Sequence, residues 1–310
     1  IVYGCTMEKK DKFRVYHKGI ADIKDLNALK GSKYVQSNTT GIFKQVLEEL
    51  KKNTMILFCG TPCQVAGLNR FLKKDYKNLF TVDLICHGVP SERMFNDFVK
   101  NYEKNNSEEI QGIDFRSKKE GIDSTRFFYA EIKSEKRVKR VFCKLLSYYG
   151  YFLDGDIYRE SCYFCKYACP ERIGDITLGD GWGAESAIET IKQKFGKRFN
   201  KERGISTVLI NSEKGKKLFD IVSDNLLSIK TDIKTVSMHN HQLSRPSQKK
   251  KEYEDLMEQY HKWGYEYIDQ NYFSKLGKKQ YLYYKLYIAL SNRISNNFKE
   301  KIKVLLNHKI

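Results

Sequence analysis

The chain has 310 residues, of which 41% are apolar and only 4 are proline, so it can form a packed core and is not a wholly disordered protein. Its net charge of +18 comes from 56 basic residues, mostly Lys, scattered among 38 acidic ones. Phosphate-binding surfaces are usually local and rich in Arg, so we expect no nucleic-acid partner. The sequence has no apolar run of 18 residues and no secretory signal at Ile1. We therefore predict no transmembrane segment and a cytoplasmic location.

The first 60 residues predict a strand pair, a helix and a buried strand. IVYGCTM (1–7) and FRVYHKG (13–19) alternate in polarity around a polar turn, which is typical of a hairpin. A helix should follow, with Thr39 or Thr40 as its N-cap. Its predicted apolar face is formed by Ile42, Phe43, Val46, Leu47 and Leu50. MILFCG (55–60) is a continuous apolar run of the kind that forms a buried parallel strand.

A strand–helix–strand unit is predicted next. Pro62 suits the first position of a helix, LFTVDLICHG (79–88) reads as a second buried strand, and Ser91 opens another helix. The crossover in such a unit is almost always right-handed, which makes the two strands parallel. Both strands then end at the edge where open α/β sheets bind ligands. This topology brings Cys59, Cys63 and Cys86 to one edge.

The remaining segments complete the predicted fold. Residues 110–118 and 125–133 read as a hairpin, and 143–158 as a helix. Residues 176–180 and 204–212 read as strands, and 213–226 as a helix. The predicted fold class is α/β: a βαβ core with a mixed sheet, a cysteine-rich loop and a helical C-terminal extension.

Two domains are predicted, a main domain over 1–244 and a Tyr- and Lys-rich helical extension over 245–310. The mixture of aromatic and basic residues in the extension would suit an anionic membrane or a protein partner. Packing on the main domain is the preferred interpretation. The residues expected to make that contact are Trp263, Tyr267, Phe273, Leu276 and Tyr287.

Cys162, Cys165 and Cys169 lie within the short segment CYFCKYACP (162–170). C-x2-C is a common half-site for zinc. C-x2-C-x3-C-P also matches the last three positions of the bacterial ferredoxin pattern, so an iron–sulfur cluster is equally open. A disulfide is disfavoured in a reducing compartment. Of the other thiols, Cys59 is expected to be a small core residue, and Cys5 and Cys143 buried or incidental.

Four segments carry a family resemblance: GSKYVQS (31–37), LFCGTPCQVAGL (57–68), VDLICHGVPS (82–91) and CYFCKYACPERIGDITLGDGWG (162–183). In their order and approximate spacing, over roughly residues 1–260, they resemble the coenzyme F420 hydrogenase/dehydrogenase beta-subunit family. The resemblance implies an iron–sulfur flavoprotein oxidoreductase subunit. In such a subunit an FAD exchanges hydride with F420 or another donor, and a [4Fe-4S] cluster passes single electrons to an acceptor.

The resemblance also implies site residues. The cluster ligands would be Cys63, Cys86, Cys162 and Cys165. Relatives need no thiol at the position of Cys169, but the ferredoxin-like spacing favours it, so Cys169 is the reserve ligand. The flavin contacts would be Gly31, Ser32, Lys33, Tyr34, Ser37, Thr61 and Gln64. The residues alone leave two interpretations of 31–40: an anion site before a helix N-terminus, or an ordinary capped loop.

No catalytic acid or base is identified. The family's N-terminal glycine- and serine-rich segment has no counterpart before Ile1, and no ferredoxin-like domain is present. We therefore expect a ferredoxin-like domain or another electron-transfer protein as partner, and a deazaflavin or other hydride donor. The alternative is a non-catalytic structural zinc domain that uses the same cysteines.

Overall fold

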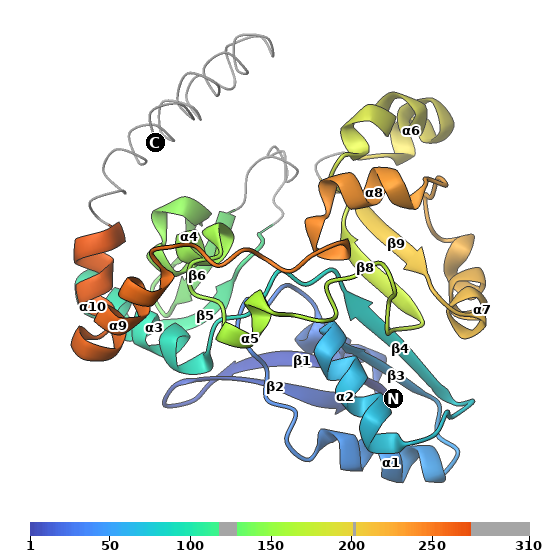
Figure 1. Cartoon of the computed structure of the whole chain (residues 1–310), viewed down its shortest axis with the longest axis horizontal. Helices are drawn as coiled ribbons and strands as arrows, with labels where there is room; N and C mark the ends of the chain where they lie inside the picture. Colours follow the sequence, from blue (N-terminus) through green and yellow to red (C-terminus); the bar gives the residue numbers. More distant parts are fainter. Residues whose placement is uncertain (118–128, 201–202, 274–310) are drawn as a thin grey trace.

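The computed structural model describes residues 1–117, 129–200 and 203–273 (Figure 1). A six-stranded sheet has the order β2-β1-β3-β4-β8-β9, and a second sheet has the order β5-β6-β7. The strands of the larger sheet are β1 (Val2–Lys9), β2 (Phe13–Ile20), β3 (Ile56–Gly60), β4 (Leu79–Leu84), β8 (Ile176–Asp180) and β9 (Ser206–Ile210). Those of the smaller sheet are β5 (Ile110–Asp114), β6 (Tyr129–Ser134) and β7 (Val138–Phe142). The predicted α/β class is confirmed.

The strand pairing of the larger sheet agrees with the sequence patterns. β1 and β2 form the predicted antiparallel hairpin, with Val2 opposite Ile20. β3 and β4 are parallel, with Ile56 opposite Leu79 and Gly60 opposite Asp83. β8 is parallel to β4, and β9 closes the sheet as an antiparallel edge. The carboxyl ends of β3 and β4 therefore meet at one edge, as the βαβ unit predicted.

Helices α1 (Ile42–Lys51) and α2 (Pro62–Leu72) pack against β1, β3 and β4. The predicted Thr39 or Thr40 cap of α1 is wrong. The N-cap is Gly41, whose positive φ of 77° lets the chain enter the helix without a side-chain cap. The start of α2 at Pro62 is confirmed, and Thr61 and Gln64 form a capping box there. β4 ends at Leu84, so the predicted strand was too long and Cys86 lies beyond it.

A second core joins the smaller sheet to helices from both halves of the chain. It is built by α3 (Glu92–Asn106), capped by Ser91 as predicted, and by α4 (Ser147–Asp154). α9 (Tyr253–Trp263) and α10 (Tyr265–Ile268) add side chains to the same cluster (Figure 1). Most of the large buried side chains are aromatic, and several rings lie 5–6 Å apart, as Phe95 and Tyr148 do at 5.2 Å.

The C-terminal packing residues were only partly predicted. Tyr267 and Phe273 pack against the aromatic cluster, as expected. Trp263 does not, since 56% of it is exposed. The chain turns at Gly264, whose φ is 81°, and this turn leaves Trp263 outside the buried face of α9. Leu276 and Tyr287 lie outside the described residues, and the domain boundary at 244/245 stays a prediction.

Helices α6 (Ile188–Phe195), α7 (Glu213–Ser223) and α8 (Ile233–His239) lie around β8 and β9 (Figure 1), whereas α5 (Glu160–Tyr163) contributes Tyr163 to the aromatic cluster. Short 3-10 segments cover Ile23–Leu29, Cys143–Leu145, Ala184–Ala187, Gly196–Arg198 and His241–Leu243, and a π-turn covers Asp269–Phe273. Within the described ranges, no helix combines the length and apolar character that crossing a membrane requires.

Candidate metal centre

Two of the predicted ligands follow the carboxyl ends of neighbouring parallel strands. Cys63 lies in the first turn of α2, directly after β3, and is exposed. The hydroxyl of Thr61 lies 3.2 Å from its Sγ atom, within hydrogen-bonding distance. Cys86 follows β4 and is more deeply placed. The sheet topology thus places two thiols from different strands at one edge.

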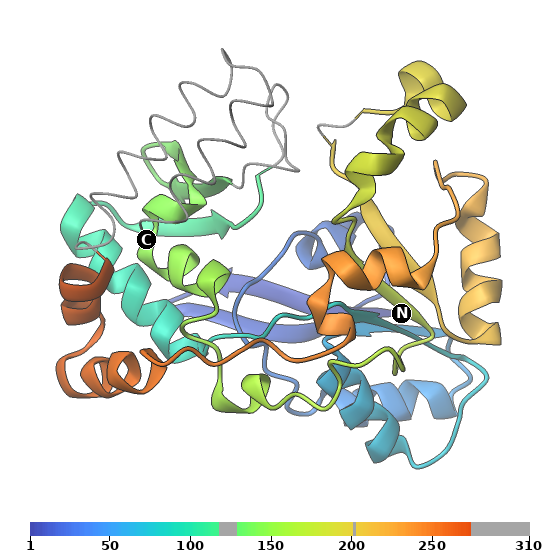
Figure 2. The same ribbon diagram turned by 45° about the horizontal axis from the view of Figure 1, so that its top comes forward.

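The segment that carries Cys162 and Cys165 docks on the residues after Cys86. The N–H of Arg159 donates to the carbonyl oxygen of Val89 at 3.0 Å. In the opposite direction, the N–H of Val89 hydrogen-bonds the Cys162 sulfur. The N–H of Gly88 bonds the Cys86 sulfur in the same way. Figure 2 shows α5, which contains Cys162, beside the N-terminal end of α2.

Gly88 is required at this docking site. Its φ of 136° is a backbone conformation that side chains rarely allow, and a Cβ atom there would lie 2.5 Å from the Tyr158 ring. The glycine lets two successive N–H groups face two different sulfurs. Backbone N–H groups that converge in this way favour negative charge on the atoms they face.

The four predicted ligands influence one another electrostatically. The pKa of Cys86 is raised to about 12, mainly by burial, with smaller upward contributions from Cys63, Cys162 and Cys165. The pKa of Cys162 is likewise raised, mainly by burial and then by Cys63 and Cys165. Cys169 contributes to neither. Its Sγ atom instead lies 3.3 Å from the carbonyl oxygen of Glu171, within its own loop.

The four thiols are neighbours, not an assembled ligand set. Across the described ranges, no three His, Cys, Asp or Glu side chains form a group that could hold a metal ion as they stand. The donor chemistry nevertheless fits: four cysteines suit a [4Fe-4S] cluster or zinc. Hydrogen bonds from N–H groups to the sulfurs, present here at two of them, are characteristic of iron–sulfur sites.

The other cysteines lie elsewhere. Cys143 is buried as expected, and burial raises its pKa to about 12. Cys59, on β3, is half-buried, and burial raises its pKa to about 11. Cys5 on β1 is also half-buried. All eight cysteines are free thiols.

Three of the predicted flavin contacts form one hydrogen-bonded network. Gln64 donates from Nε2 to Ser37 Oγ at 2.8 Å and accepts the N–H of Thr61 at 2.9 Å. Ser37 Oγ in turn lies 3.0 Å from His17 Nδ1. Since His17 Nε2 faces the carbonyl of Cys59 at 3.0 Å and must donate, Nδ1 accepts from Ser37. Thr61 therefore connects this network to Cys63.

The other predicted contacts, Gly31 to Tyr34, form a loop on the aromatic cluster. The Tyr34 ring stacks on Phe152 at 4.2 Å, which makes it largely a packing residue. Lys33 Nζ donates to the carbonyl oxygen of Lys30 at 2.7 Å, and burial lowers the pKa of this amine. Gly31 is exposed with a φ of 80°, and Ser32 follows it.

Comparison with known families decides the class of the protein. A family model for the C terminus of the beta subunit of coenzyme F420 hydrogenase/dehydrogenase matches residues 53–234. The chain belongs to this family. The matched range begins just before β3, ends in α8 and contains all four predicted ligand cysteines. The resemblance seen in the sequence is confirmed, and the family is one of oxidoreductase subunits. No curated protein matches the chain.

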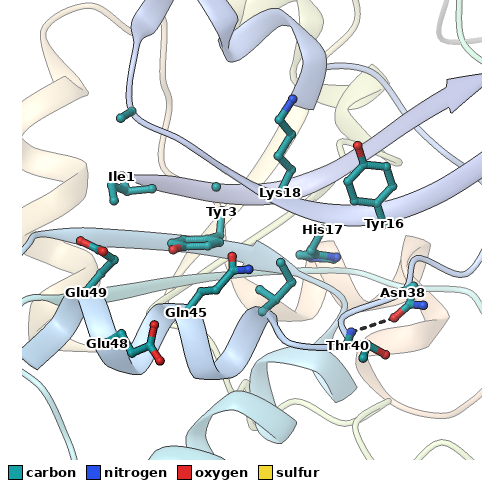
Figure 3. A pocket seen from close by; sticks show the side chains of 13 residues that line it. Ile1, Tyr3, Tyr16, His17, Lys18, Asn38, Thr40, Gln45, Glu48 and Glu49 are labelled. Atoms are coloured by element: carbon teal, nitrogen blue, oxygen red, sulfur yellow. Dashed lines mark hydrogen bonds between the residues drawn. The ribbon is translucent and has the colours of Figure 1, made fainter.

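A pocket of about 620 Å³ lies between β1, β2 and α1 in this F420-family chain (Figure 3). We call it the acid-walled pocket and define it by Tyr3, Tyr16, Lys18, Glu48 and Glu49. Burial raises the pKa of Tyr3, and the nearby Glu49 and Glu48 raise it further. Carboxylates on one wall repel phosphate, so this pocket does not suit the pyrophosphate of FAD. None of the cysteines lines it.

Several residues that contact the predicted site residues were missed from the sequence. Gly88, Val89, Tyr158 and His17 hold the predicted residues in place, but they belong to no motif with a known spacing. Asp180, the last residue of β8, accepts two 2.7 Å hydrogen bonds from Arg116, which lies two residues after β5. Such contacts depend on segments that are far apart in the chain.

Proposed function

We propose that this chain is an electron-transferring subunit of an F420-type oxidoreductase. In this proposal Cys63, Cys86, Cys162 and Cys165 hold a [4Fe-4S] cluster, and an FAD exchanges hydride with F420 or another donor. The supporting observation is that these thiols come from three segments that meet at the carboxyl edge of the sheet, where the Arg159 N–H bonds the carbonyl oxygen of Val89, and that Cys63, Cys162 and Cys165 each raise the pKa of Cys86. Family membership supports the oxidoreductase class.

The chain's own groups suit this role. A [4Fe-4S] cluster supplies one-electron transfer when it is bound. The N–H groups of Gly88 and Val89 lie against two of the proposed ligand sulfurs, whereas the Thr61 hydroxyl beside Cys63 donates its proton to Gln64 Oε1. Hydrogen bonds to sulfur stabilise negative charge on it, and burial of Cys86 limits the access of water.

The flavin part of the proposal is supported by family membership and by the loop that holds Gly31, Ser32, Lys33 and Tyr34. The side chains of Ser37, Thr61 and Gln64 are hydrogen-bonded to one another, so their proposed role is to hold this loop beside Cys63. Flavin suits such a subunit because it exchanges both hydride and single electrons. The proposed partner is a ferredoxin-like domain or another electron-transfer protein.

A structural zinc site is the second candidate. The Cys162-x2-Cys165 half-site and the all-thiol environment favour it as well. With zinc bound, the cysteines would form a structural site that stabilises the fold and has no role in electron transfer.

Anaerobic purification with iron, sulfide, zinc and flavin analysis distinguishes the two. We expect a brown protein with about four iron and four sulfide per chain, together with flavin absorbance. A colourless protein with about one zinc would overturn the cluster proposal. Iron and sulfide without flavin would remove only the FAD part.

A further inference from the structure

The side chain of Arg172 is buried at the base of the cysteine loop, with 2% of its surface exposed. Its guanidinium group has five N–H donors in a planar, fixed arrangement. Each finds an acceptor 3.0–3.3 Å away. The acceptors are the Thr177 hydroxyl, the carbonyl oxygens of Tyr167, Cys169 and Leu84, and the Asp83 carboxylate.

These contacts connect the two halves of the proposed ligand set. Nη1 holds the carbonyl oxygens of Tyr167 and Cys169, just after Cys165 in the loop. Nη2 holds Asp83 and the carbonyl oxygen of Leu84, just before Cys86. The Arg172 guanidinium group therefore fixes the cysteine loop relative to the end of β4. On each side, one of its acceptors lies two residues from a proposed ligand.

Asp83, the ion-pair partner of Arg172, is also buried and hydrogen-bonded. It is fully buried, and its second carboxylate oxygen accepts the N–H groups of Gly174 at 3.0 Å and Ile173 at 3.3 Å. Gly174 permits this approach, because a Cβ atom there would lie 2.7 Å from the Asp83 nitrogen. Burying two charges costs desolvation free energy that their attraction often fails to recover, so stability alone is a weak explanation for the pair.

We propose that Arg172 is a positioning residue for the metal centre, which sets the place of Cys162 and Cys165 relative to Cys63 and Cys86. The nature of the metal group rests on the proposed function, whereas the positioning of the thiols does not. Lys cannot replace Arg here, since an ammonium group is a point donor and cannot reach acceptors in several directions of one plane.

The test uses two variants of the full chain. Arg172→Lys keeps the charge but loses the planar donor group. The double variant Asp83→Asn/Arg172→Gln removes both charges, so that no unpaired charge stays buried, while an Asn oxygen can still accept from Gly174. The matched control is Lys214→Gln, which removes the ion pair between Lys214 of α7 and Asp75 in the loop before β4.

Two readouts are measured. The first is iron per chain after anaerobic reconstitution, which we expect to fall roughly tenfold or more in both variants, as for other residues that orient metal ligands. The second needs no metal: a short bifunctional methanethiosulfonate should join Cys63 to Cys162 in the metal-free wild-type protein. The yield of this cross-link, read by mass spectrometry, should fall severalfold in both variants and stay unchanged in Lys214→Gln.

A rescue experiment separates positioning from general stability. Added guanidinium at a non-denaturing concentration should restore part of the cross-link and iron in the double variant, and ammonium at the same ionic strength should not. Wild-type cross-link yields in both variants would overturn the proposal. Unfolding of both variants without rescue would also overturn it, since Arg172 would then act only on stability. A wild type that cross-links but binds no iron would contradict the proposed function and leave the positioning role supported.

Discussion

Two polar regions of the same sheet differ in how the chain builds them. The cysteine edge, which we define as Cys63, Cys86, Cys162 and Cys165, draws its thiols from segments up to a hundred residues apart. The acid-walled pocket is formed by β1, β2 and α1, all within the first 51 residues. The pocket therefore comes from local chain, whereas the group of cysteine side chains needs long-range contacts. Our proposed function rests on the chemistry of the cysteine edge and not on the volume of the pocket.

The difference also predicts where the protein is sensitive to substitution. The cysteine edge depends on close contacts such as Gly88 against Tyr158, and on the Arg172–Asp83 pair. The acid-walled pocket has exposed side chains among its walls, such as Glu48 on α1 and Lys18 on β2 (Figure 3). Substitutions at the two regions should separate metal loading from general stability.

The largest effect should come from removing a cysteine of the edge. We expect Cys86→Ala to reduce iron per chain roughly tenfold or more, because this half-buried thiolate ligand has no substitute among the remaining proposed ligands. Iron analysis after anaerobic reconstitution measures this. Cys169→Ala is the control, and its iron content should equal that of the wild type. If Cys169→Ala loses iron and Cys86→Ala keeps it, the ligand assignment is wrong.

A matched pair of glycine substitutions should separate the two regions. A Cβ atom at Gly179 would lie 2.4 Å from Ile85, next to Cys86, and one at Gly19 would lie 2.7 Å from the Tyr3 ring in the pocket. Overpacking costs about 1–3 kcal/mol, so urea unfolding should show both Gly→Ala variants destabilised. Only Gly179→Ala should also lose iron. Equal iron loss in both would show that the regions are coupled.

Alkaline pH should destabilise the metal-free protein through the cysteine edge. The pKa of Cys86 is raised from 9.0 to about 12, mainly by burial. Between these values the unfolded thiol is ionised and the folded thiol is not, so the unfolded state binds fewer protons. The free energy of unfolding should therefore fall as pH rises from 9 to 12, by up to about 1.4 kcal/mol per pH unit for this thiol.

Denaturant unfolding at several pH values checks this prediction. In Cys86→Ala the loss of stability between pH 9 and 12 should be smaller than in the wild type, though not absent, because the pKa of Cys59 is also raised, to about 11. An identical pH dependence in the two proteins would contradict the assignment of Cys86 to this loss.

The smallest effect should come from the wall of the acid-walled pocket. Glu48→Gln removes a surface charge, so the free energy of unfolding should change by less than about 0.5 kcal/mol. Glu49→Gln also weakens the contacts of Glu49 with Lys52 and Thr54, so its effect on stability should be somewhat larger. Iron per chain should not change. A loss of iron in either variant would show that the acid-walled pocket affects metal loading. The two regions would then not be independent.

Local chemistry made much of the fold predictable. Alternation of polar and apolar residues predicted the β1–β2 hairpin, and Pro62 and Ser91 predicted the starts of α2 and α3. Where prediction failed, local signals competed. Thr39 and Thr40 were plausible caps, yet Gly41 takes that place because it alone adopts the positive φ easily. Trp263 was expected to be buried, but the turn at Gly264 leaves it exposed.

The sequence by itself determined the α/β class, the family and the cysteines that merit testing, because these depend on periodicity, spacing and ordered motifs. Only the tertiary structure decided that Gly88 and Val89 direct their N–H groups at two of the thiols, that the Cys169 sulfur stays within its own loop, and that Arg172 joins that loop to β4. The reason is physical: a buried donor is satisfied by whichever acceptor the packing brings near, and packing between distant segments leaves no periodic trace in the sequence.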